Sequence, residues 1–166
     1  MTVLPTERRQ MPVIRGNQGH KIDCCVLVNR PATEAYHFWR DFRNLPRFMK
    51  SVLSVTYGEN PMVTHWKVQG PFGLHMHWDA EIINLHENEL ISWRTIGQPQ
   101  VTSAGSVRFM NGPVDCSVIV RVIAEYVPPM GRFGVALAAM LHEDPVQMIQ
   151  TDLYRMKQLL ETGSVE

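Results

Sequence analysis

The segment from residue 52 to residue 127 constrains the fold most, because its apolar residues recur at every second position. Short runs with this period, rich in β-branched and aromatic residues, predict strands. The segments between the runs are short and contain Gly, Pro and Asn, so sequential strands are expected to pair antiparallel. We expect six such strands, near residues 52–58, 62–69, 74–85, 89–96, 104–111 and 116–127.

Further elements precede these strands. Residues 21–29 (KIDCCVLVN) favour a strand of their own. Pro31 suits the first turn of a helix, and the apolar residues after it recur at helical spacing, which predicts a short helix. Asn44 is expected to cap a second short helix that begins at Leu45 and Pro46.

A long amphipathic helix is predicted near the C-terminal end. Residues 135–142 (VALAAMLH) begin a helical pattern that Pro145 kinks or restarts. Asp144 is a suitable N-cap, and Gly163 suits the C-terminal end. The apolar stripe consists of Val146, Ile149, Leu153, Met156, Leu159 and Leu160. This order of elements predicts an α+β fold in which a bent antiparallel sheet packs on the long helix and leaves an apolar space between them.

The composition argues against several classes of protein. The chain has 166 residues, with 16 Lys and Arg against 16 Asp and Glu, so it suits one domain and has no basic excess for a nucleic-acid partner. Its three cysteines show no metal-binding spacing and fit reduced thiols in a cytoplasm, and we expect neither a metal nor a cofactor. Residues 1–19 lack a long apolar run, so we predict a polar arm rather than a membrane span, followed by one domain over residues 20–163.

The hairpin around residues 70–74 decides which side chains of HMHWDAE (residues 75–81) face the core. An even loop of four residues would mix apolar and polar side chains on each face. An odd loop of five residues pairs Trp66 with Trp78 and places the His, Asp and Glu side chains together on the opposite face. Because a slip of one residue exchanges the two faces, burial selects the odd loop.

The polar face of this hairpin is therefore expected to lie in solvent, outside the sheet. An alternative is a metal site formed by His75, His77 and a third ligand, because imidazoles at i and i+2 of a strand can chelate. His65 and Asp79 are candidates for the third ligand. An exposed sheet face lacks a shaped cavity, so we favour the solvent-exposed arrangement. The arginines expected on this face, paired with Glu81 or Glu125, are Arg94, Arg108 and Arg121.

Five segments resemble the bacterial polyketide cyclase/dehydrase family of the START-like superfamily (SRPBCC, or Bet v 1-like), which includes the coenzyme Q-binding START proteins. They are NRPATEAYHFWRDFRNLPRFMKSVLSV (29–55), HWDAEIIN (77–84), ISWRTI (91–96), AGSVRF (104–109) and DLYRMKQLLETG (152–163). The resemblance implies the helix-grip fold, in which a seven-stranded antiparallel sheet wraps around a long C-terminal helix and encloses a deep cavity. It implies no catalytic residue, because no catalytic motif of the family matches this sequence position by position.

We expect the cavity to be lined by inward-facing residues of the strands and by the segment before the long helix. The alternative is that these residues only pack in the hydrophobic core. Met and aromatic side chains adapt to lipophilic guests. The predicted lining residues are Trp66, Met76, Trp78, Trp93, Phe109, Tyr126, Met130, Phe133, Leu137 and Met140.

Three functions are consistent with these features. The favoured one is a binding module that holds a lipid, quinone or polyketide-like molecule, as a monomer or homodimer without membrane insertion. The second is a polyketide cyclase/dehydrase (aromatase) that works by acid–base catalysis in the same cavity. Its candidate groups, if they point inward, are Tyr36, His37, Tyr126 and Arg132. The third is a protein-interaction module that uses the outer sheet face or the helix.

Overall fold

The computed structural model describes residues 19–70, 73–99, 101–127 and 144–165. The arm predicted over residues 1–19 lies outside this part of the chain, apart from Gly19, and so does the helical segment predicted at 135–142.

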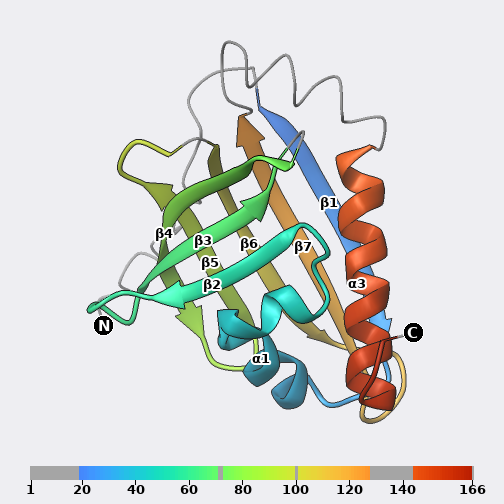
Figure 1. Ribbon diagram of the computed structural model, residues 1–166. Coiled ribbons are helices and arrows are strands. Elements are labelled where there is room, and N and C mark those ends of the chain that lie inside the picture. The colour runs from blue at the N-terminus through green and yellow to red at the C-terminus, as the bar shows by residue number, and fades with distance from the viewer. Residues whose placement is uncertain (1–18, 71–72, 100, 128–143, 166) are drawn as a thin grey trace, which may run out of the picture.

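Seven strands form one antiparallel sheet in the order β1-β7-β6-β5-β4-β3-β2, which confirms the predicted fold class. The strands are β1 (His20–Val28), β2 (Val52–Tyr57), β3 (Val63–Gln69), β4 (His75–His86), β5 (Leu90–Ile96), β6 (Thr102–Asn111) and β7 (Val118–Val127). Figure 1 shows the sheet strongly curled, so that β2, β3 and β4 cross in front of the other strands. A concave face results, and the helices lie against its open side and one end.

Two short helices close one end of the curled sheet. They are α1 (Ala32–Arg40) and the 3-10 helix η1 (Phe42–Arg47). Because apolar side chains of this segment point into the sheet, they belong to the best-buried part of the core. The residues with at most 2% exposure in these helices and directly after η1 are Ala35, Phe42, Leu45 and Phe48.

The predicted start of the second helix is wrong by three residues. Asp41, and not Asn44, is the N-cap, because its carboxylate accepts a hydrogen bond from the Arg43 backbone N–H at 3.1 Å. Asn44 lies inside η1, where its side-chain amide donates to a carbonyl oxygen of α1 at 2.9 Å. Both residues suit an N-cap, but Asp41 caps η1 and Asn44 links η1 to α1 by a hydrogen bond.

The long helix α3 (Pro145–Thr162) runs beside the edge strand β1 (Figure 1). An edge strand presents unpaired backbone groups, and α3 satisfies some of them. The Gln150 side-chain amide donates to the Cys25 carbonyl oxygen at 2.9 Å, and the Lys157 ammonium donates to the Leu27 carbonyl oxygen at 2.9 Å. These contacts fix the position of the helix along the sheet.

Both predicted caps of α3 are confirmed. The Asp144 carboxylate accepts a hydrogen bond from the Val146 N–H at 3.0 Å, and Gly163 ends the helix with a left-handed φ of 83°. Among the described residues, no helix combines the length and the apolar character needed to cross a membrane.

The hairpin of β3 and β4 has the predicted odd loop, with Trp66 opposite Trp78 and His65 opposite Asp79. The two indole rings stack with centroids 6.1 Å apart and planes 17° apart. Such an aromatic pair contributes about 0.5–1.5 kcal/mol beyond the area it buries. The alternation of HMHWDAE therefore separates a concave apolar face from a convex polar face.

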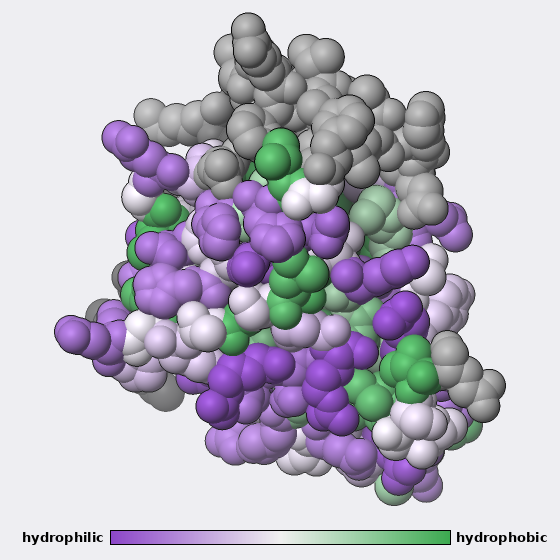
Figure 2. All heavy atoms as spheres, viewed as in Figure 1, coloured by the Kyte–Doolittle hydropathy of each residue, from purple (hydrophilic) through white to green (hydrophobic). Residues whose placement is uncertain are grey.

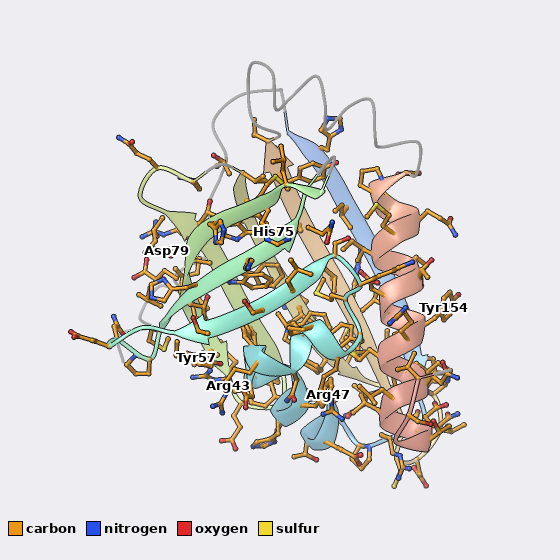
Figure 3. The ribbon with its side chains drawn as sticks, in the orientation of Figure 1. Arg43, Arg47, Tyr57, His75, Asp79 and Tyr154 are labelled. Atoms are coloured by element: carbon orange, nitrogen blue, oxygen red, sulfur yellow. The ribbon has the colours of Figure 1, made fainter. Side chains whose placement is uncertain are left out.

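The convex face of β2, β3 and β4 is largely hydrophilic (Figure 2). His75 and Asp79 are exposed there (Figure 3), and the described residues include no group of three His, Cys, Asp or Glu side chains that could hold a metal ion.

Arg94 pairs with Glu81 at 3.1 Å, as predicted. Arg121 pairs at 2.6 Å with Asp23 of the neighbouring strand β1, so the expected pairing with Glu81 or Glu125 is wrong for this residue.

Candidate functional site

A cavity of about 250 Å³ lies between the concave face of the sheet, the short helices and α3. Its sheet wall comes from all seven strands, and its helix wall comes from α1, η1 and the N-terminal half of α3. This volume is near the lower end for ligand pockets, which span about 300–1,000 Å³. The described lining residues are Ile22, Trp39, Phe42, Leu45, Met49, Ser51, Val52, Trp66, Val68, Trp78, Ala80, Trp93, Thr95, Val101, Ser103, Val122, Ala124, Tyr126, Met148, Ile149 and Asp152.

All four tryptophans of the chain lie on this wall. Trp39 comes from α1, whereas Trp66, Trp78 and Trp93 come from three adjacent strands. Trp93 is paired with Gly105 of β6, and the absence of a side chain there leaves room for the indole ring. A Cβ atom at Gly105 would lie 2.8 Å from Cζ2 of Trp93. Because Gly105 has no Cβ atom, it determines how Trp93 packs at this wall of the cavity.

The structure brings together four of the ten predicted lining residues, namely Trp66, Trp78, Trp93 and Tyr126. Met76 and Phe109 are buried but lie off the wall. Met76 folds toward Gly70, where a Cβ atom would be 3.3 Å from its Cγ, and Phe109 packs edge-on against Tyr36. The four predicted residues that lie outside the described part of the chain are Met130, Phe133, Leu137 and Met140.

Asp152 on α3 is a carboxylate in this otherwise largely apolar cavity, and it is only 9% exposed. One of its oxygens, Oδ1, accepts a hydrogen bond from the Lys50 backbone N–H at 3.3 Å. Burial raises the pKa of the Asp152 carboxyl from 3.8 to about 6, and that hydrogen bond and the positive charges of Arg155 and Lys50 oppose the rise only in part. Asp152 can therefore gain or lose a proton close to neutral pH.

Sequence reasoning missed Asp152, although the sequence contains a signal for it. Asp152 follows Ile149 by three residues and precedes Met156 by four, so it lies on the apolar stripe of the helix. A carboxylate on the stripe that faces the core is an exception to the amphipathic pattern. Such an exception indicates either a buried partner or a functional group.

The other candidate acid–base groups lie elsewhere. Tyr36 is buried in the core beside Phe109, off the cavity wall, and burial raises the pKa of its hydroxyl. His37 is exposed and contacts the Thr33 carbonyl oxygen. Arg132 lies outside the described residues. Of these candidates, Tyr126 is the one that the described structure places on the wall.

The curled sheet, the long helix and the apolar cavity between them define a helix-grip protein with an internal ligand-sized cavity. The chain belongs to the family described as "Polyketide cyclase / dehydrase and lipid transport", whose model matches residues 28–153. The resemblance seen in the sequence is therefore confirmed at the level of the family and the fold.

Individual relatives agree with this assignment. The solved structure of DR_A0006 from Deinococcus radiodurans is 27% identical, with a TM-score of 0.70 over 87% of this chain and 98% of that one. The Zhui aromatase/cyclase from Streptomyces sp. R1128 shares the fold at 13% identity, with a TM-score of 0.66 over 89% of this chain and 99% of that one. An uncharacterised 17.2 kDa protein from the melC2-rnhH intergenic region of Streptomyces lincolnensis is 33% identical over 89 residues, 54% of this chain. The match spans 57% of that relative's length.

Proposed function

We propose that this protein binds a small lipophilic molecule, of the lipid, quinone or polyketide-like kind, in the cavity between the sheet and α3. The observation that carries the proposal is the wall itself, which combines four tryptophans and many aliphatic side chains with few polar groups. Apolar walls with a small number of placed polar groups are typical of small-molecule sites. The volume of about 250 Å³ favours a compact guest over a long extended chain.

Tryptophan fluorescence tests this function, because all four indoles lie on the cavity wall. Titration with 2-naphthol, a compact two-ring probe, should change the emission and saturate at one molecule per chain. The variant Ala124→Phe fills the cavity and should weaken binding by roughly tenfold or more. Its matched control is Ile123→Phe, since Ile123 is the adjacent residue of β7 and lies on the opposite face. Equal binding by both variants would place the probe outside the cavity.

A second function, cyclisation and dehydration of a poly-β-keto chain, is favoured by Asp152. A group with a pKa of about 6 serves as a base and then as an acid near neutral pH. Its carboxylate would take an α-proton between two carbonyls, and the resulting enolate carbon would attack a third carbonyl to close the ring. The protonated Asp152 would return that proton to the new alkoxide, and loss of the hydroxyl with another α-proton would release water.

The variant Asp152→Asn separates the two functions, because the amide keeps a carbonyl acceptor for the Lys50 N–H but cannot exchange a proton. Turnover of a synthetic tri-β-keto ester, followed by the absorbance of its aromatic product, should fall by roughly 10²–10⁴-fold. Its KM should change little. An unchanged kcat would exclude Asp152 as the acid–base group.

A further inference from the structure

Three polar residues form a row across the sheet wall of the cavity. Thr95, Ser103 and Tyr126 come from the adjacent strands β5, β6 and β7, and all three line the cavity. Ser103 and Tyr126 are directly opposite each other in the antiparallel ladder, so their side chains share the concave face. Asp152 belongs to the helix wall and Ser51 lies directly before β2, so the polar groups of the cavity are divided among its walls.

Thr95 uses its hydroxyl within the protein. Its Oγ1 accepts a hydrogen bond from the Ser103 N–H at 3.0 Å and donates to the Ser103 carbonyl oxygen at 3.3 Å. The last paired residues of β5 and β6 are Arg94 and Ala104, so the Thr95 side chain extends this connection by one residue. The backbone of Ser103 is thereby fixed, and its own hydroxyl remains available to the cavity.

The hydroxyls of Ser103 and Tyr126 have no hydrogen-bond partner among the described residues. The Tyr126 ring is held by stacking on His20, with centroids 5.2 Å apart and planes 23° apart. Burial raises the pKa of the Tyr126 hydroxyl, and the nearby negative charge of Asp144 adds to the rise, so the group remains a donor at neutral pH. Neither hydroxyl is among the fully buried unpaired atoms of the described residues, so both are accessible to a polar group of a ligand in the cavity.

We propose that Ser103 and Tyr126 form a second hydrogen-bonding subsite on the sheet wall, separate from Asp152 on the helix wall. The ligand is then a compact apolar molecule with two oxygen substituents, one directed to Asp152 and the other to the Ser103–Tyr126 pair. A lipid with a single polar head group would leave one of the two subsites unfilled. This inference rests on the proposed binding function and narrows the class of ligand.

Calorimetric titration with two probes tests the subsite. 2-Naphthol carries one hydroxyl and is expected to use Asp152, whereas 2,6-dihydroxynaphthalene carries a second hydroxyl at the other end of the same rings. The wild-type protein should bind the diol roughly fivefold to tenfold more tightly, as expected for an added neutral hydrogen bond. In the double variant Ser103→Ala/Tyr126→Phe the ratio of the two affinities should fall to about one.

Two controls keep the outcomes distinct. Tyr154→Phe removes a phenol hydroxyl from the exposed side of α3 (Figure 3) and should retain the preference for the diol. Each single variant, Ser103→Ala or Tyr126→Phe, keeps most of its packing and should lose part of the preference. If the double variant keeps the full preference, or the wild type has none, the subsite is refuted while cavity binding stands. If neither probe binds the wild type, both the subsite and the proposed function fail.

Discussion

Replacement of Asp152 by Asn should stabilise the protein at neutral pH, even though Asp152 is the proposed functional group. Burial raises the pKa of this carboxyl from 3.8 to about 6, so the folded state binds the proton more tightly than the unfolded state. As far as Asp152 is concerned, the free energy of unfolding is therefore highest below pH 3.8. It falls as the pH rises to about 6 and does not change further above that. At about 1.4 kcal/mol per pH unit, this loss amounts to about 3 kcal/mol.

Urea denaturation of both proteins between pH 5 and pH 8 measures this effect. The variant should gain about half of this stability at pH 5 and about 3 kcal/mol above pH 7, since Asn keeps an acceptor for the Lys50 N–H without the buried charge. Asp23→Asn is the matched control, because Asp23 is exposed and the Arg121 guanidinium lowers its pKa. Its effect should be small and opposite in sign. If the free-energy difference between Asp152→Asn and wild type is the same at pH 5 and pH 8, the buried-charge reasoning is wrong.

Other substitutions test the packing around the cavity. Gly105→Ala should cost about 1–3 kcal/mol, because its Cβ would meet Trp93 and Ala124, and near-ultraviolet circular dichroism should report the displaced indole. Ala124→Gly should partly restore the stability of that variant. Asp144→Ala should cost about 1 kcal/mol by removing the cap of α3, and Asn at this position should retain most of the stability. Met156→Ala, at a fully buried position, should cost about 2–5 kcal/mol in denaturant, and a loss below 1 kcal/mol would contradict the packing of α3 on the sheet.

The features predicted correctly from the sequence are those that depend on residues close together in the chain. The alternation of the hairpin has one register that separates polar from apolar side chains, and the structure has that register between Trp66 and Trp78. The caps at Asp144 and Gly163 are likewise local, because each depends on one residue and its neighbouring backbone. For the same reason the identity and order of the strands could be read from period and turn residues.

The features that were missed depend on contacts between distant segments. Arg121 pairs with Asp23 because β1 and β7 are neighbours, and 98 residues separate the two side chains in sequence. Met76 and Phe109 are buried, but Met76 lies beside Gly70 and Phe109 packs against the Tyr36 ring, and neither lines the cavity. The position of Asp152 on the apolar stripe of α3 could have been read from the sequence, but its contact with the Lys50 backbone N–H could not.

We propose that a lipophilic molecule occupies the space between the sheet and α3. The most direct test is nuclear magnetic resonance of methyl-labelled methionines during titration with 2-naphthol, with resonances assigned by single Met→Leu variants. Met49 and Met148 line the cavity, whereas Met110 is 38% exposed and lies off its wall. We expect saturable shifts of the Met49 and Met148 methyl signals and no shift for Met110. Shifts confined to Met110, or no saturable shift at Met49 and Met148, would contradict the proposal.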